Sequence, residues 1–272
     1  MKAVKTQGVV LRYTNINESD RILTVFSPEL GKIPVMSRGC RRPKSRFLAS
    51  SQLFCYSEFV LTRYRDLMIM TQAEVKTAFF DIRNDLERFA YASYILNIVD
   101  EAVNPGEENY HLFALLLKTL SYLSFSDIQP EDITAVFELK LMELIGYRPE
   151  LETCVLCGTL PETVVKPRYQ GQTQAQSGSL FSVFHGGIVC RACATDAGRV
   201  FPFTPESLSC MKHILDMDVD GGDIRDIQFS PGIREQLHVM LPVFVSEKLD
   251  KHFKSRDYID SLKNATTGDK NL

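Results

Sequence analysis

Residues 21–46 read RILTVFSPELGKIPVMSRGCRRPKSR. The runs at 21–27 and 32–37 are rich in β-branched and aromatic residues, and SPELG at 27–31 has the composition of a turn, so this stretch predicts two consecutive strands. A segment broken by glycine and proline follows, with five basic residues in nine positions: Arg38, Arg41, Arg42, Lys44 and Arg46. The pattern predicts β structure that carries a strongly basic loop.

Three more runs with strand composition surround this stretch, at 4–14, 53–62 and 67–75. Five short strands before residue 77 fit a small Greek-key barrel of the OB type, although a split sheet fits the same pattern nearly as well. The basic segment lies between the third and fourth of these strands. We therefore expect it to be a loop on the rim of the barrel.

The charge of the chain is divided unevenly along its length. The 272 residues together have a formal net charge of -3. The first 80 residues hold 13 Lys and Arg against 6 Asp and Glu, a net charge of +7, so the remaining residues have a net charge of -10. Such an asymmetry is typical of a basic module that faces a polyanion.

Beyond residue 81 the hydrophobic period changes from that of strands to that of helices. Apolar residues recur at helical spacing, at Leu86, Phe89, Leu96, Val99 and Val103. Further helices are predicted at 110–123, 132–145, 205–217 and 233–254, the last of them kinked or restarted at Pro242. Apolar stripes of this kind form the core of a helical bundle and carry no visible chemistry. A polar loop is expected at 168–179.

The strongest chemical signal is a pair of C-x₂-C motifs, Cys154–Cys157 and Cys190–Cys193. Two such motifs supply four thiolates for tetrahedral coordination, and Gly158 after the first motif permits the positive φ that the turn favours. We predict one structural zinc ion per chain, held in a module at 151–200 that includes a strand at 180–184. The weaker alternatives are an empty metal site, a redox pair and four unrelated core thiols.

Other patterns argue against catalysis and membrane insertion. Gly31-Lys32 resembles the end of a phosphate-binding loop, but Phe26 and Ile33 stand where that motif needs Gly and Ser or Thr. A site closed by four thiolates leaves no coordination position for metal catalysis. The apolar run at 112–117 is far shorter than a bilayer span. We predict a cytoplasmic protein that is not an enzyme, in which Cys40, Cys55 and Cys210 are packing or incidental residues.

Four segments together resemble the RecO family of DNA repair and recombination proteins: GVVLRYTNINESDRILTVFSPELGKIPVMSRGCRRPKSR at 8–46, GYRPELETCVLCG at 146–158, FSVFHGGIVCRAC at 181–193 and HFKSRDYIDSL at 252–262. The resemblance extends from the N-terminus to about residue 262. With the patterns above, it implies an α+β multidomain fold with an inserted zinc-finger module built on four cysteines. The expected divisions are an OB-fold domain at 1–80, a helical domain at 81–150 and 201–262, the zinc-finger module at 151–200 and a flexible tail at 263–272.

The resemblance also implies a function in recombinational repair by the RecF pathway. Family members bind single- and double-stranded DNA, anneal complementary strands, and act with RecR and single-stranded-DNA-binding protein to load RecA. A bacterial cytoplasmic protein that associates with the nucleoid during repair is implied. The five loop cations are the expected DNA contacts, because arginine offers bidentate hydrogen bonds to phosphate. The surface is expected to extend to Arg12, Lys32, Arg63 and Arg65.

Several details of the expected DNA surface depend on local conformation. Arg63 and Arg65 share one strand face if the fourth strand continues past Thr62. Phe47 and Tyr64 either stack on bases or belong to the core. Cys40 lies inside the basic segment, where an exposed thiol would make the loop sensitive to oxidation.

Two function hypotheses follow, an annealer and recombination mediator, and a protein-interaction adaptor whose DNA contact is incidental. Salt-dependent DNA binding by the isolated protein separates them. The resemblance further implies capture of the acidic, hydrophobic-ended tail of single-stranded-DNA-binding protein. The residues expected to guide that tail are Lys248, Lys251, Lys254 and Arg256.

Overall fold

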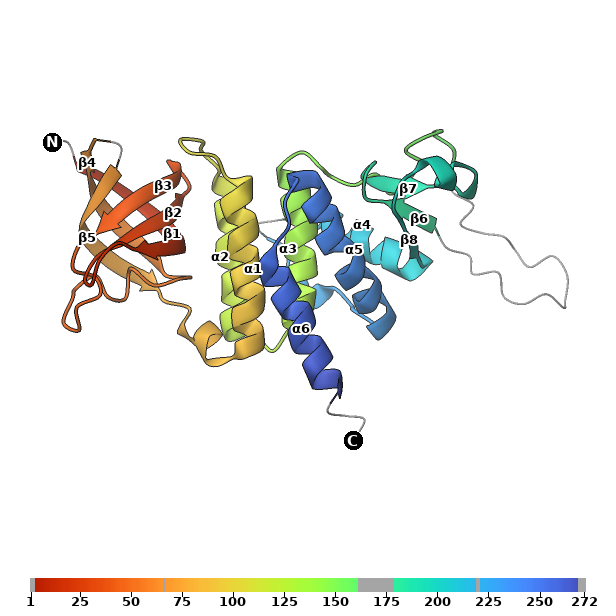
Figure 1. Ribbon diagram of the computed structural model, residues 1–272. Helices are drawn as coiled ribbons and strands as arrows, with labels where there is room; N and C mark the ends of the chain where they lie inside the picture. The colour runs from red at the N-terminus through yellow and green to blue at the C-terminus, as the bar shows by residue number, and fades with distance from the viewer. Residues whose placement is uncertain (1–2, 66, 161–178, 219–220, 269–272) are drawn as a thin grey trace, which may run out of the picture. The chain divides into compact units, whose positions relative to one another are not determined.

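A computed structural model describes residues 3–65, 67–160, 179–218 and 221–268 (Figure 1). The chain divides into two compact units. Unit 1 comprises residues 1–130 and 253–272, and unit 2 comprises residues 131–252. The polar loop expected at 168–179 lies outside the described residues except for Ser179, and so does the end of the expected tail, 269–272.

Unit 1 begins with a closed five-stranded barrel of the OB-like kind (Figure 1). Its strands are β1 (Ala3–Asn15), β2 (Arg21–Ser27), β3 (Gly31–Ser37), β4 (Tyr56–Tyr64) and β5 (Leu67–Thr77), and they pair in the order β1-β2-β3-β5-β4. Every pairing is antiparallel except that of β3 with β5, which is parallel. This closure confirms the barrel and excludes the split sheet.

Alternation of side chains along the strands fills the barrel. On β4, for example, Phe59 and Leu61 are fully buried while Val60 between them is only partly buried. The core also includes residues from the other strands and from the segment after β3: Val10, Leu23, Val25, Ile33, Val35, Cys40, Phe47 and Met70.

Three helices and a short 3₁₀ turn complete unit 1: η1 (Phe80–Asn84), α1 (Leu86–Ala102), α2 (Tyr110–Phe125) and α6 (Lys254–Gly268). Asp85 and Asn109 are the N-caps of α1 and α2, each accepting a backbone N–H from the first turn. Phe113 of α2 packs its ring against the rings of Phe26 and Tyr56, with centroids 5.4 Å and 5.9 Å away. These aromatic contacts join the barrel to the helices.

Unit 2 combines helices with a small sheet. Its elements are α3 (Pro130–Leu144, which begins at the unit boundary), β6 (Ser179–Ser182), β7 (Gly187–Val189), η2 (Arg191–Asp196), β8 (Val200–Phe203), α4 (Pro205–Asp216), η3 (Ile224–Asp226) and α5 (Pro231–Leu249). The sheet has the order β7-β6-β8. Phe181 of β6 packs edge-to-face on Phe244 of α5 at 5.4 Å, which joins the sheet to the helices.

The helix expected at 233–254 is wrong in its boundaries. The structure has α5 passing through Pro242 without restarting, and α5 ends where Asp250 adopts a left-handed φ of 48°. A separate helix, α6, begins at Lys254 and continues to Gly268, beyond the point where the tail was expected to begin. The sequence pattern also predicted one strand near 180–184 and missed β7 and β8, which are too short to show a period.

No helix among the described residues is long and apolar enough to cross a membrane.

We expect Leu61→Ala to lower the free energy of unfolding of the barrel by about 2–5 kcal/mol, because the change leaves a cavity among fully buried side chains. Val60→Ala on the opposite face of β4 is the matched control and should have a much smaller effect. Native-state amide exchange of barrel peptides measures both. Equal losses would contradict the inward orientation of Leu61.

Candidate nucleic-acid interface and metal centre

The five predicted loop cations lie together on the segment that links β3 to β4, residues 38–55. All five are exposed: Arg38, Arg41, Arg42, Lys44 and Arg46. The backbone is folded into successive turns, in which Arg42 N–H donates to the Gly39 carbonyl at 3.2 Å and Ser45 N–H to the Arg42 carbonyl at 2.9 Å. We call residues 38–46 the basic loop. It presents its charges from a folded backbone.

Cys40 of the basic loop and Phe47, the residue after the loop, anchor this segment in the barrel. Cys40 is 1% exposed and Phe47 is 7% exposed, and both belong to the barrel core. Burial of Cys40 corrects the expectation that its thiol would make the loop sensitive to oxidation. Phe47 is a core residue and not a platform for bases, since its ring is covered by barrel side chains.

The loop cations differ in whether their side chains form hydrogen bonds with other parts of the protein. Arg41 Nη1 donates to the Asn17 carbonyl at 2.6 Å, and Arg46 Nη2 donates to the Thr71 carbonyl at 3.0 Å. Carbonyl oxygens carry no net charge, so both guanidinium charges stay uncompensated. Across the described ranges, the remaining three form no ion pair or side-chain hydrogen bond: Arg38, Arg42 and Lys44.

The expectation that Arg63 and Arg65 share a strand face is wrong. β4 does continue past Thr62, but it ends at Tyr64, and Arg65 has a left-handed φ of 54°. Arg63 Nε instead bends back toward the Arg65 carbonyl at 3.4 Å. Tyr64 is 46% exposed and has the Arg65 guanidinium 5.6 Å from its ring centroid. An exposed aromatic ring beside arginine has the composition of a base-stacking surface.

Arg12 and Lys32 hold the barrel to helix α1. Both pair with Asp100 on that helix, with Arg12 Nε 2.7 Å and Lys32 Nζ 3.3 Å from its carboxylate oxygens. Lys32 also donates to the Asp100 backbone carbonyl. One carboxylate therefore offsets part of the charge that the sequence assigned to DNA contact at these two positions.

Sequence reasoning used residues 16–20 only as part of the longer segment 8–46 and gave this turn between β1 and β2 no role at the site, although it contacts the basic loop directly. Asp20 Oδ1 accepts the Gly39 N–H at 2.6 Å, and the Ser19 carbonyl accepts the Arg41 N–H at 3.0 Å. The signal in the sequence is the run Asn17-Glu18-Ser19-Asp20, whose residue types favour turns. That composition predicts a turn and says nothing about the partner it holds.

The four predicted metal ligands in unit 2 come together. Ligand atoms of Cys154, Cys157, Cys190 and Cys193 all lie within 4.8 Å of one another, and the Cys157 and Cys190 sulfurs are 3.7 Å apart. A tetrahedral zinc–thiolate site with bonds of about 2.3 Å has sulfurs roughly 3.8 Å apart, so the arrangement is compatible with zinc. Gly158 adopts φ +73°, as the turn after the first motif requires.

Backbone donors favour the ionised form of the Cys154 sulfur. Burial alone raises the pKa of the Cys154 thiol, but hydrogen bonds from the Cys190, Leu156 and Cys157 N–H groups outweigh burial and lower that pKa to about 6. The neighbouring sulfurs of Cys190 and Cys157 raise the pKa of Cys193 to about 12. Thiolates this close repel one another, and a divalent cation between them removes the repulsion.

The four cations expected to guide a partner's tail are divided between the units. Lys248 and Lys251 belong to unit 2, whereas Lys254 and Arg256 belong to unit 1. Lys248 is partly buried: its amine donates to the Phe184 carbonyl at 2.6 Å, and desolvation lowers its pKa. Arg256 pairs with Asp260 at 3.0 Å on the next turn of α6.

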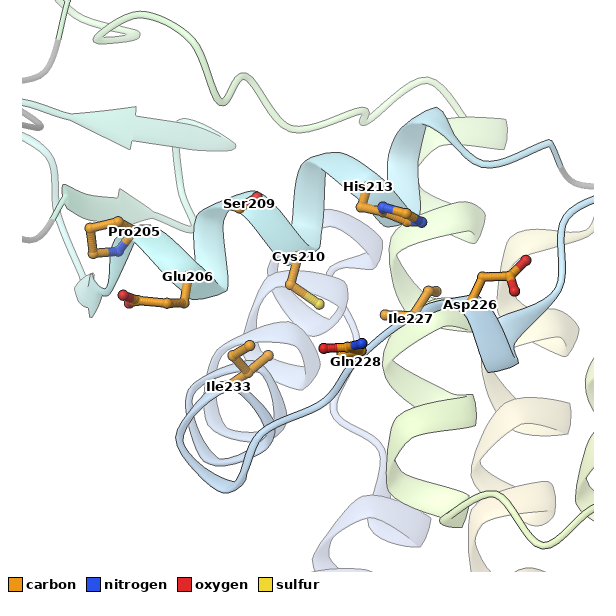
Figure 2. A pocket seen from close by; sticks show the side chains of 9 residues that line it. All are labelled: Pro205, Glu206, Ser209, Cys210, His213, Asp226, Ile227, Gln228 and Ile233. Carbon is orange, nitrogen blue, oxygen red and sulfur yellow. The ribbon is translucent and has the colours of Figure 1, made fainter.

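Unit 2 also contains a groove of about 560 Å³ between α4 and the segment that leads into α5 (Figure 2). Figure 2 shows the Cys210 sulfur pointing into it. Burial raises the pKa of this thiol to about 11, so it stays protonated at neutral pH and is a poor nucleophile. None of the described lining side chains forms a hydrogen-bonded nucleophile–base pair with another. The lining comprises Pro205, Glu206, Ser209, Cys210, His213, Asp226, Ile227, Gln228 and Ile233.

Comparison with known proteins matches both halves of the chain. The family model described as Recombination protein O N terminal matches residues 1–79, and that described as Recombination protein O C terminal matches residues 83–257. A protein of Acetivibrio thermocellus named DNA repair protein RecO is 32% identical over 96% of this chain and 98% of its own length. A protein of the same name from Alkaliphilus metalliredigens is 34% identical over 91% of this chain and 94% of its own length.

Proposed function

Because this chain belongs to the RecO family of DNA repair proteins, we propose that it is a non-enzymatic DNA-binding protein that anneals complementary strands in recombinational repair. The observation that carries the proposal is the basic loop, in which five exposed cations are held on a folded backbone at the end of the barrel. Phosphate contact by such a loop gives affinity that is independent of sequence.

The proposed surface has a centre and a margin. Its centre is the basic loop, where three cations have no hydrogen-bond or ion-pair partner among the described residues. Arg63 and Arg65 extend it, and the exposed ring of Tyr64 between them stacks on bases. Arg12 and Lys32 are minor contributors because Asp100 offsets their charge.

Annealing requires more than binding to one strand. Two phosphate backbones repel each other, and bases nucleate a duplex only when both backbones are partly neutralised. Concentrated positive charge on one loop serves that purpose, either within one molecule or between two. Pairing of complementary strands releases free energy, so the proposed reaction needs no nucleotide.

In the cell, we infer that the protein acts with RecR and single-stranded-DNA-binding protein to promote RecA loading in the RecF pathway, in the bacterial cytoplasm and at the nucleoid during repair. An acidic tail of the single-stranded-DNA-binding protein is attracted to exposed positive charge, such as that of Lys254 on α6. Arg256 on the same helix contributes less to that attraction, because it already pairs with Asp260.

We further propose that the four cysteine thiolates bind one zinc ion in a structural role. Zinc supplies charge neutralisation and a tetrahedral link between two segments far apart in the sequence. The chain's own contribution is the set of backbone N–H groups at Cys154 and the Thr159 hydroxyl 3.0 Å from the Cys157 sulfur, which orient the ligands.

The zinc proposal predicts about one zinc per chain in protein purified under reducing conditions without chelator. Changing Cys154 and Cys157 to Ser should abolish zinc content, lower the melting temperature of unit 2 and leave the barrel folded, since structural zinc contributes on the order of 10 kcal/mol to a small module. Cys210→Ser is the matched control for loss of a buried thiol outside the cluster. Fully folded wild-type protein without metal would refute the proposal.

For the basic loop, we predict a salt dependence of single-stranded DNA binding that includes about -0.7 per phosphate contact, or about -3.5 for five contacts, in the log–log slope. Changing Arg41, Arg42 and Lys44 to Ala should flatten the slope by about 2 and weaken binding to all sequences alike. Fluorescence anisotropy over a range of salt concentrations measures both effects.

A control for the triple variant must remove equal charge elsewhere. Changing Arg199, Lys212 and Arg225 in unit 2 to Ala does so and should leave the slope near that of the wild type. If the loop variant also kept the wild-type slope, the DNA contacts would have to lie outside the basic loop.

Annealing itself is predicted to be accelerated by substoichiometric protein without ATP, and the Arg41, Arg42 and Lys44 triple variant should lose most of the acceleration. Stopped-flow quenching of complementary labelled strands measures the rate. DNA binding without acceleration at any protein-to-DNA ratio would favour the adaptor hypothesis instead.

A further inference from the structure

The turn between β1 and β2 (residues 16–20) is organised by one amide side chain. Asn17 Oδ1 accepts two backbone N–H groups, from Ser19 at 2.9 Å and from Asp20 at 2.8 Å. This arrangement fixes the orientation of the amide, so its Nδ2 group must face the other way. Nδ2 donates to Asp20 Oδ2 at 2.9 Å. The Asp20 carboxylate is therefore held in place by its own turn.

The other oxygen of that carboxylate contacts the start of the basic loop. Asp20 Oδ1 accepts the Gly39 N–H at 2.6 Å and the Ser19 hydroxyl at 3.2 Å. Gly39 has a φ of +66°, a conformation that directs the chain from the end of β3 into the loop. Arg41 is held by the same turn through its backbone N–H and its guanidinium, which bond to the Ser19 and Asn17 carbonyls.

The negative charge of Asp20 is unexpected beside a loop that is proposed to bind phosphate. A carboxylate beside cations that meet phosphate repels the phosphate, so on charge alone Asp20 weakens DNA binding. Hydrogen bonds from the Gly39 N–H and then from Asn17 hold the pKa of Asp20 below its usual value, so the carboxylate stays charged at neutral pH. The geometry gives Asp20 an effect in the other direction, because its carboxylate holds the start of the basic loop through the Gly39 N–H.

We infer that Asp20 is a positioning residue for DNA binding, which holds the start of the basic loop through Gly39 in the conformation that presents Arg38, Arg41 and Arg42 to phosphate. The inference rests on the proposed function of the basic loop. Asp20 does not touch DNA. Its effect is to order the loop before binding, so that less conformational freedom is lost when phosphates are contacted.

Asp20→Asn tests the inference because it removes the charge and keeps the shape. With Asn17 fixed, an amide at position 20 puts a donor against either the Gly39 N–H or Asn17 Nδ2, so one contact is lost. Glu18→Gln is the matched control: Glu18 is exposed on the same turn and makes no side-chain hydrogen bond to another described residue. Asn17→Ala breaks the turn without changing the charge.

The inference predicts opposite effects from two substitutions that remove the same charge. Asp20→Asn should weaken single-stranded DNA binding by about tenfold, in line with loss of a hydrogen bond to a charged group. Glu18→Gln should tighten binding slightly, by less than about twofold, because it only removes repulsion. Asn17→Ala should weaken binding like Asp20→Asn. The salt slope should stay near that of the wild type in all three, since every loop cation is kept.

A second measurement reports on the loop without DNA. Trypsin cleaves after Arg38, Arg41, Lys44 and Arg46 only when the loop opens, so cleavage in native Asp20→Asn and Asn17→Ala protein should be several-fold faster than in the wild type and in Glu18→Gln. Unchanged cleavage, or DNA binding that tightens in Asp20→Asn as in Glu18→Gln, would overturn the inference. Failure of the proposed function looks different, because the Arg41, Arg42 and Lys44 triple variant would then bind DNA like the wild type.

Discussion

The parallel pairing of β3 with β5 is the constraint on which the rest of unit 1 depends. Val35 and Met36 lie opposite Met68 and Ile69, and this short contact closes the barrel. Because β5 occupies the place beside β3, the chain cannot continue from β3 into β4 by a hairpin and must cross the end of the barrel. Segment 38–55 is that crossing. Closure therefore requires the long connection whose exposed side chains include the five basic residues.

The effect of a basic residue in unit 1 depends on where the fold places its side chain, and not only on how many basic residues there are. The loop cations stand on backbone fixed by buried Cys40 and Phe47 and by the turn before β2, so their charge faces solvent. Arg12 and Lys32 come from the same basic region of the sequence, yet they pair with Asp100 and join the barrel to α1. A net charge of +7 over the first 80 residues thus serves two purposes, and only the fold separates them.

The cysteine cluster depends on the small sheet of unit 2, which brings two pairs of ligands together from distant parts of the sequence. Cys154 receives the backbone N–H of Cys190 at 3.3 Å, although the two residues are 36 positions apart. β6, β7 and β8 hold the second pair of cysteines against the first, and Phe181 ties the sheet to α5. The resulting arrangement of four sulfurs is compatible with binding of one zinc ion.

The sequence by itself determined the strand composition of the barrel, the helices α1 to α4, the two cysteine pairs and the position of the basic loop, because each depends on local periodicity or on short spacing. It did not determine where α5 ends, the strands β7 and β8, or that Arg65 leaves the strand face, since those depend on turns and packing. Only the tertiary structure decided which residues stand beside each other. The contacts of Asp20 with Gly39 and of Asp100 with Arg12 join segments whose sequences carry no sign of one another, and burial of Cys40 follows from the closed barrel alone.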